Sequence, residues 1–222
     1  MNKKILSLTT TLLLVLLFAS CGTRGGNATI SDCINGVVIN GVRWATRNVD
    51  APGTFTENPE DAGLFFQWNR KRGWYATDEE FREGWDIRSS FTSTIWGTEW
   101  YAENDPCPTG WRVPTREELE QLRLTNSEWT NRNGVYGRLF GTAPNQIFLP
   151  AAKSLSTGGS IIWHLGNHGA YWSRTLQKES KGIDNIAWCF TFSASDFYDS
   201  EYLFLLSGMH KGLGFNIRCV AK

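Results

Sequence analysis

Apolar and polar positions along this chain change in short runs, and one of these runs has the spacing of a helix. Leu119 and Leu122 lie three residues apart and would face the same side of a helix. Thr115 precedes them as a favourable N-cap, and Glu118 stands three residues later, which completes a capping-box pattern. We therefore predict a short helix that begins directly after Thr115.

The residues before this helix predict a rigid loop that holds a cysteine. Pro106 and Pro108 fix the backbone on either side of Cys107, and each proline favours an extended conformation in the residue before it. A cysteine held in this way is well placed for a covalent cross-link, so its partner is a central question for the fold.

The other apolar runs predict short strands. Asn40-Gly41 lies between the β-branched runs Val37 to Ile39 and Val42 to Ala45, which is the strongest local signal for a hairpin. Ala62 to Arg70 is apolar and aromatic, and it fits either a buried strand or the start of a short helix. The further strand candidates are Ile147 to Ala152, Ile161 to His164, Ala170 to Arg174, Ile186 to Phe192, Tyr202 to Leu206 and Gly214 to Val220.

Two stretches predict irregular structure. Tyr75 to Glu103 shows no sustained period, and Asn131 to Gly141 is rich in turn residues. Short helices in the first half, followed by strands alone, predict an α+β domain with an antiparallel sheet.

Aromatic residues are abundant for a chain of 222 residues, with 11 Trp and 13 Phe beside 22 Gly. This composition predicts a loop-rich domain with a substantial core, to which we assign Trp44, Trp111, Trp172 and Trp188. The formal net charge is zero. The charge therefore gives no electrostatic reason to expect nucleic acid as a partner.

The first residues predict export and lipid attachment. A basic start is followed by an apolar run from Ile5 to Phe18, and small residues then lead to Cys21. This order is typical of a bacterial lipoprotein signal that is cleaved before Cys21, which then carries the lipid. An ordinary signal peptide or a transmembrane helix is the alternative, although the run is short for a membrane span. The predicted parts are a signal peptide over 1–20, a flexible tether over 21–32 and one domain over 33–222.

Four cysteines remain in the exported domain, namely Cys33, Cys107, Cys189 and Cys219. An even number in an exported chain indicates two disulfides, and the spacing leaves all three pairings open. No two of them have a C-x-x-C spacing, so the sequence predicts neither a zinc site nor a redox motif.

Four motifs occur in an order that resembles one protein family. They are Asp105-Pro106-Cys107-Pro108-Thr109-Gly110-Trp111-Arg112-Val113-Pro114-Thr115, Phe148-Leu149-Pro150-Ala151-Ala152, Gly169-Ala170-Tyr171-Trp172-Ser173 and Gly214-Phe215-Asn216-Ile217-Arg218-Cys219-Val220. From Val37 to Val220 the chain resembles the Fibrobacter succinogenes major paralogous domain family, which is common in exported and lipid-anchored proteins of Bacteroidetes-type bacteria. That family is similar to the C-type lectin-like fold, as are formylglycine-generating enzymes and variable proteins diversified by retroelements.

The resemblance implies a fold and a disulfide pairing. It implies a C-type lectin-like fold with short helices packed on antiparallel sheets, in which the terminal strand lies beside strands from the middle of the chain. It therefore pairs Cys107 with Cys219 and leaves Cys33 with Cys189. The first link would close a loop of about 110 residues, and the second would tie the N-terminal arm to the sheet.

Motifs that mark catalysis or metal binding are absent from the sequence. It contains no Gly-x-Ser-x-Gly elbow, phosphate loop, His-Glu-x-x-His or dinucleotide fingerprint. His164 and His168 lie four apart, but the glycines around them predict a turn rather than a metal site. Ala143-Pro144-Asn145 lacks the carboxylate of calcium-binding lectin loops, so we expect calcium-independent binding. We expect no cofactor, no metal and no catalytic residue.

One polar and aromatic segment near the C-terminus is the candidate ligand-binding surface. It lies where C-type lectin-like proteins carry binding loops, and its Tyr, Asp and Ser residues are typical of adaptable binding surfaces. An ordinary polar hairpin with Phe197 in the core is the alternative. The candidate residues are Asp196, Phe197, Tyr198, Asp199, Glu201 and Tyr202, bordered by Trp163, His164, Asn167 and His168.

Together these patterns predict a non-catalytic lipoprotein of the outer membrane, at the cell surface or on the periplasmic face. Its expected role is adhesion through binding of a glycan or a protein, with the membrane as partner through the lipid anchor. An enzyme on a formylglycine-generating-like scaffold and a structural or pilus-associated subunit are the alternatives.

Overall fold

The domain is built almost entirely from short antiparallel strands, so the predicted α+β class with several short helices is wrong. The computed structural model describes residues 36–77, 83–87, 97–162, 167–177, 185–194 and 204–222. These residues contain fourteen strands, one α-helix and one 3-10 helix. The difference arises because, within the described residues, one stretch combines a helix cap with an apolar stripe, whereas most of the other apolar runs there pair as strands.

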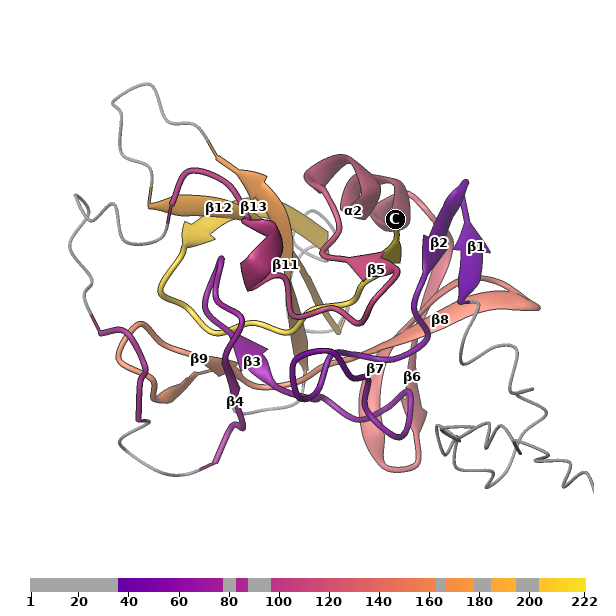
Figure 1. Cartoon of the computed structure of the whole chain (residues 1–222). Coiled ribbons are helices and arrows are strands. Elements are labelled where there is room, and N and C mark those ends of the chain that lie inside the picture. The colour runs from indigo at the N-terminus through magenta and orange to yellow at the C-terminus, as the bar shows by residue number, and fades with distance from the viewer. Residues whose placement is uncertain (1–35, 78–82, 88–96, 163–166, 178–184, 195–203) are drawn as a thin grey trace, which may run out of the picture.

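Three sheets and two small strand pairs make up the domain (Figure 1). The terminal sheet has the order β1 (Val37–Ile39), β2 (Val42–Trp44), β14 (Val220–Ala221) and β5 (Trp111–Arg112). The hairpin sheet contains β6 (Ser127–Arg132), β7 (Val135–Thr142) and β8 (Asn145–Pro150). The central sheet contains β11 (His168–Leu176), β12 (Ile186–Ser193) and β13 (Phe204–His210). The small pairs are β3 (Phe65–Phe66) with β4 (Gly73–Trp74) and β9 (Ser154–Leu155) with β10 (Ile161–Ile162), and the 3-10 helix η2 spans Ala102–Asn104.

The predicted N-terminal hairpin is confirmed. Asn40 and Gly41 have φ angles of 49° and 80°, which is the backbone of a type I′ turn. The terminal sheet then joins the ends of the domain, because Val220 pairs with both Trp44 and Arg112. Figure 1 shows the C-terminus beside β5 and β2.

The predicted helix is also confirmed, as α2 (Arg116–Arg123). Thr115 caps it, and both hydrogen bonds of the capping box with Glu118 are present. Leu119 and Leu122 are buried, as their spacing requires. The carboxylate of Glu118 also accepts two hydrogen bonds from the Arg112 guanidinium, at 2.6 and 2.8 Å, so one side chain fixes both the helix start and the loop before it.

A second hairpin occupies the stretch that we predicted as turn-rich. Asn131 to Gly141 forms the end of β6, a tight turn and most of β7. Asn133 and Gly134 have φ angles of 48° and 88°, so this turn repeats the geometry of the first hairpin. We did not predict these strands because they contain many polar residues, so apolar and polar positions do not alternate clearly along them. The neighbouring candidate, Ile147 to Ala152, is β8 shifted by two residues.

The central sheet is buried on both faces. Trp172 and Cys189 pack into one core cluster, whereas Tyr171 and Phe190 pack into another that includes the buried side of α2. Two predicted strands, Ala170 to Arg174 and Ile186 to Phe192, are confirmed within β11 and β12. The other candidates fit only in part, because β13 runs from Phe204 to His210, and β10 covers Ile161–Ile162 while the rest of that candidate lies outside the described residues.

The predicted strand from Gly214 to Val220 is wrong over most of its length. The segment forms single bridges to Leu155, Phe66 and Tyr171 in three different elements. Its backbone then accepts hydrogen bonds from Ala45 and Val49 before the pairing of β14 begins. This segment therefore crosses the middle of the domain and connects its sheets.

Ala62 to Arg70, for which strand and helix were both open, forms the two-residue strand β3 and a turn. The four tryptophans assigned to the core divide evenly. Trp44 and Trp172 are buried, whereas Trp111 and Trp188 are partly exposed. Trp188 keeps one face available for the Arg116 guanidinium, which lies 4.5 Å from its ring centroid.

Arg218 lies at the junction of these elements and is buried. Its Nε donates to Asn48 Oδ1 at 2.9 Å, and its Nη atoms donate to the carbonyls of Ala45 at 3.2 Å and Phe148 at 2.9 Å. Burial lowers the pKa of Arg218 to about 10, so the guanidinium remains charged at neutral pH. Three segments far apart in the sequence are thus held by one side chain.

Candidate functional site

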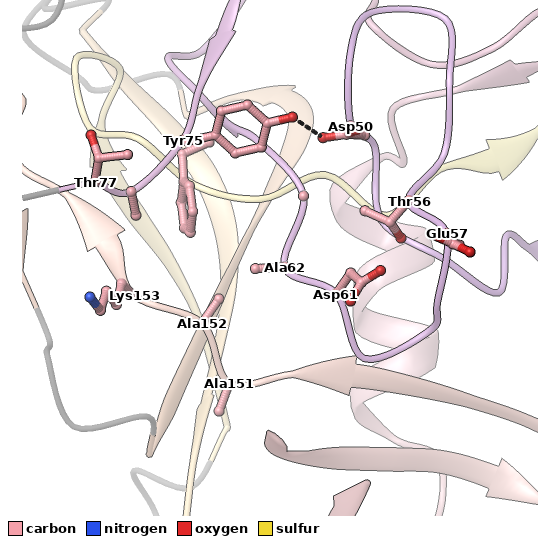
Figure 2. Close-up of a pocket in the computed structure, with 13 residues that line it drawn as sticks. Asp50, Thr56, Glu57, Asp61, Ala62, Tyr75, Thr77, Ala151, Ala152 and Lys153 are labelled. Carbon is pink, nitrogen blue, oxygen red and sulfur yellow. Dashed lines mark hydrogen bonds between the residues drawn. The ribbon is translucent and has the colours of Figure 1, made fainter. Parts of the chain in front are cut away.

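The candidate site is an open pocket of about 790 Å³ on the side of the domain that carries β3 and β4. Three segments meet there: the loop between β2 and β3, the chain after β4 and the chain after β8. The lining residues are Asp50, Thr56, Glu57, Asp61, Ala62, Gly63, Phe65, Tyr75, Ala76, Thr77, Ala151, Ala152 and Lys153. Figure 2 shows their arrangement.

Local hydrogen bonds shape the loop that forms one wall. The turn after Asp50 closes where the Asp50 amide donates to the Thr54 carbonyl at 3.1 Å. Further along, Asp61 Oδ2 accepts a hydrogen bond from the backbone amide of Asn58 at 2.9 Å. Gly63 has a φ of 68°, and a Cβ there would lie 2.2 Å from the Val49 carbonyl oxygen. Only glycine allows this close approach, which brings both ends of the loop together.

Tyr75 is the exposed aromatic residue of the pocket, with 59% of its surface accessible. Its hydroxyl donates to Asp50 Oδ1 at 3.2 Å, as Figure 2 shows. The negative charge of Asp50 raises the pKa of Tyr75 above its ordinary value, with smaller contributions from burial and from the hydrogen bond. The phenol is therefore protonated at neutral pH and acts as a donor.

Charged groups of both signs line the pocket. Asp50, Glu57 and Asp61 lie on the loop wall, whereas Lys153 comes from the segment after β8 (Figure 2). Behind the wall, Arg47 donates to the carbonyls of Thr56 and Glu57, both at 3.0 Å. Burial lowers the pKa of Arg47, although the charges of Asp61 and Glu57 oppose this effect. The wall therefore combines acidic side chains with a cationic support.

The inner part of the pocket is apolar. Phe65 is 2% exposed, and Ala151 and Ala152 are buried beside it. Phe65 and Ala152 belong to a small core cluster with Trp74 and Trp85. This rigid apolar floor beneath polar walls is the usual composition of a small-molecule binding site.

The second hairpin supports the acidic wall from outside the pocket. Asn133, in the turn between β6 and β7, donates from its side-chain amide to the carboxylate of Glu60. Glu60 lies between the two pocket acids Glu57 and Asp61 on the loop. The position of the wall is thus tied to a turn more than 70 residues away in the sequence.

The polar side chains that line the pocket are those of Asp, Glu, Thr, Tyr and Lys residues. Its lining contains no Ser, Cys or His. Over the described parts of the chain, no group of three or more His, Cys, Asp or Glu side chains is arranged to hold a metal ion. What the walls offer is a set of hydrogen-bond donors and acceptors around an aromatic ring.

The sequence analysis placed the ligand site elsewhere. Of its candidates, Asn167 and His168 lie at the start of β11, where Asn167 Oδ1 and His168 Nδ1 are 2.8 Å apart. Burial lowers the pKa of His168. Neither residue lines the pocket. The remaining candidates, Trp163, His164, Asp196, Phe197, Tyr198, Asp199, Glu201 and Tyr202, lie outside the described residues.

The pocket residues were missed because they are distant in sequence and individually unremarkable. The turn at Asp50 was visible as Asp-Ala-Pro-Gly, but nothing in the sequence links it to Tyr75 or Lys153. The exposure of Tyr75 is visible only in the structure, so the sequence carried no signal that singled this residue out.

The cysteine predictions are half right. Cys107 and Cys219 form a disulfide, with Cα atoms 6.1 Å apart, as the resemblance implied. Cys189 is a free buried thiol whose pKa is raised to about 12 by burial. The predicted Cys33–Cys189 bond is therefore wrong, because Cys189 faces the core between β11 and β13 rather than an arm of the chain. Cys33 and the predicted lipidation site Cys21 lie outside the described residues.

The described residues include no helix that is long and apolar enough to cross a membrane. Comparison with family models, curated proteins and solved structures finds no match to this chain. Membership of the Fibrobacter succinogenes major paralogous domain family therefore stays a prediction.

Proposed function

We propose that this domain is a non-catalytic binding module that holds a glycan in the pocket around Tyr75. The observation that carries the proposal is an aromatic ring, 59% exposed, set beside carboxylates and above an apolar floor. A sugar ring has an apolar C–H face that stacks on an aromatic side chain, and its hydroxyl groups both donate and accept hydrogen bonds.

The pocket offers a partner for each of these features. Asp50, Glu57 and Asp61 supply acceptors, whereas Lys153 supplies a donor and Thr56 a hydroxyl that does both. Three carboxylates against one lysine disfavour an anionic ligand, whereas a neutral, hydroxyl-rich ligand avoids this repulsion and can donate hydrogen bonds to the carboxylates. Tyr75 adds rigid contact area at a small cost in conformational entropy.

The thiol chemistry of the enzyme alternative receives no support from Cys189. A thiol must ionise and reach its substrate to react, and this one is fully buried with its pKa raised to about 12. Cys107 is already engaged in the disulfide. A binding role requires no reactive group and agrees better with these two positions.

Titration calorimetry of the purified protein against a panel of soluble oligosaccharides tests the proposal. We expect at least one neutral oligosaccharide to bind, and Tyr75→Ala and Asp50→Asn each to weaken it about tenfold or more. Tyr136→Ala is the matched control, because Tyr136 is a second exposed tyrosine that lies outside the pocket. The proposal fails if no oligosaccharide binds, or if both pocket variants bind as well as the original.

We also propose that the module is carried on the outer membrane by lipid at Cys21, with 1–20 as the signal peptide. The supporting pattern is the basic start, the apolar run and the small residues before that cysteine. Membrane fractionation tests this, since Cys21→Ser should move the protein from the membrane pellet to the soluble fraction. Retention of that variant in the pellet would contradict lipid anchoring at this position.

A further inference from the structure

Strand β6 forms one edge of the hairpin sheet. The sheet order is β6-β7-β8, so β6 pairs with β7 on one side and with no other strand of the described residues on the other. Its sequence, Ser-Glu-Trp-Thr-Asn-Arg, contains one acidic and one basic residue, and both side chains are exposed. An edge of this kind can pair with a further strand unless something covers it.

The hairpin turn fixes which backbone groups point outward. A two-residue type I′ turn closes on a hydrogen-bonded pair, here Arg132 and Val135. Hydrogen-bonded and non-hydrogen-bonded pairs alternate along an antiparallel ladder. The Gly141 amide donates to the Asn126 carbonyl at 2.8 Å, at the position that this alternation requires. Trp129 and Asn131 therefore direct their backbone N–H and C=O groups away from β7.

We propose that two copies of this chain form a homodimer by antiparallel pairing of their β6 strands, centred on Thr130. In this register Trp129 of each copy lies opposite Asn131 of the second copy as a hydrogen-bonded pair. The outward N–H and C=O groups of both residues then find partners, and the two hairpin sheets join into one. The contact is symmetric, which closes the dimer and prevents further addition at the same edge.

The charges of β6 select this register. Glu128 and Arg132 each stand two residues from Thr130, so pairing about Thr130 sets Glu128 of one copy opposite Arg132 of the second copy, twice. Both pairs fall at non-hydrogen-bonded positions, where opposite side chains approach most closely. A shift of the dyad to any other residue of the strand separates these charges, so the sequence is complementary to itself in one arrangement only.

The other face of β6 adds apolar contact. The Trp129 ring stacks on Tyr136 with a centroid distance of 6.3 Å, and Tyr136 is 55% exposed. In the proposed dimer the two Trp129 side chains lie on the same face at diagonal positions, within reach of each other. One face of the new strand pair is thus aromatic, and the other carries the two ion pairs.

Charge exchange tests the proposal in the full chain by sedimentation velocity over a concentration series. We expect a monomer–dimer equilibrium that Glu128→Arg weakens about tenfold or more, because two attractive pairs become repulsive, and that Arg132→Glu weakens similarly. The double variant Glu128→Arg/Arg132→Glu should regain the original dimer constant, because each pair is restored with its charges exchanged. Glu99→Arg is the control, since it makes the same charge change at an exposed residue away from β6.

A second pair of variants examines the backbone contact. Asn131→Pro removes an outward N–H without removing a bond to β7, whereas Asn131→Ala loses the same side chain and keeps that N–H. We expect only the proline variant to lose the dimer, with both variants folded by circular dichroism. A monomer at every concentration overturns the proposal, as does a dimer that Glu128→Arg leaves unchanged. Capture of a different protein's strand by a monomeric chain would also overturn it.

Discussion

Two groups of polar side chains lie on opposite sides of Ala62 and meet opposite environments. On the inner side, the amide nitrogens of Asn48 and Asn216 both donate to the Ala62 carbonyl at 2.9 Å, close to buried Arg218 and Tyr171. On the outer side, the Ala62 residue lines the pocket of Tyr75. Ala62 thus lies between a buried polar network and a polar network that is open to solvent.

The two networks respond differently when a side chain is removed. In the inner network, Tyr171 donates to the Pro150 carbonyl at 2.9 Å, and Arg218 donates to neutral oxygens. Removal of either side chain therefore leaves buried acceptors without partners. Outside, water replaces any contact that is lost, and a ligand can replace the water. We therefore expect substitutions on the inner side to change stability and those on the outer side to change binding.

Opening the disulfide should have the largest effect on stability. Cys107 and Cys219 are 112 residues apart, and closing a loop of that length is worth about 4–5 kcal/mol in the chain-entropy model. The double variant Cys107→Ser/Cys219→Ser should lose roughly this free energy of unfolding, measured in urea. A loss below about 1 kcal/mol would show that the C-terminal segment is held by packing alone.

Replacing Arg218 should have the next largest effect. Arg218→Met leaves the oxygens of Asn48, Ala45 and Phe148 without their donor, and we expect a loss of about 3 kcal/mol in the free energy of unfolding. Arg43→Met, at an exposed arginine of β2, should change it by less than about 0.5 kcal/mol. Equal effects from the two variants would show that the buried hydrogen bonds of Arg218 contribute no more than an exposed arginine does.

Glu118 is intermediate between the buried inner network and the open pocket, because its side chain is 19% exposed. Burial disfavours its charge, but hydrogen bonds from Arg112 and the Thr115 amide outweigh burial, so the pKa of Glu118 falls below its ordinary value of 4.5. Because the pKa is lowered in the folded state, the stabilisation by the charged carboxylate is present at neutral pH and is lost progressively as the pH falls below 4.5.

We expect Glu118→Gln to cost about 1–2 kcal/mol at pH 7, because it weakens both the ion pair with Arg112 and the capping box. The cost should shrink as the pH falls below 4.5, since the original carboxyl is then protonated as well. Urea unfolding at several pH values measures this. A cost that is constant from pH 7 to pH 3 would contradict a stabilising role for the charge of Glu118.

The smallest effect on stability should come from Tyr75→Phe. This change removes only the hydroxyl that donates to Asp50 on an exposed ring, so the free energy of unfolding should change by less than about 0.5 kcal/mol. Oligosaccharide affinity should nevertheless fall, because Asp50 loses the donor that orients it. Thermal unfolding and titration calorimetry on the same sample separate the two quantities. A large loss of stability would place Tyr75 with the inner network instead.

The two hairpins mark the limit of prediction from local sequence. Asn40-Gly41 was recognised because β-branched residues flank it, whereas Asn133-Gly134 has the same turn geometry but polar neighbours. In β6 and β7 the alternation is carried by Trp129, Tyr136 and Phe140 among charged and polar residues. Half-buried strands of this kind take their stability from cross-strand pairs, and one strand alone does not reveal its partner.

The features that could be predicted from the sequence depend on a few adjacent residues. The cap at Thr115, the capping box with Glu118 and the turn at Asn40-Gly41 are local, because each is fixed by the backbone preferences and hydrogen bonds of neighbouring residues. The Cys107–Cys219 link came from the resemblance between motifs rather than from local chemistry.

The grouping of residues that are distant in the sequence became visible only in the folded domain. The fold brought Asp50, Tyr75 and Lys153 to one pocket, set Arg218 among three segments and left Cys189 buried and unpaired with another cysteine. Such groupings depend on how all the sheets pack at once. The free energy of that packing is shared over the whole core, so no single stretch of the chain encodes it.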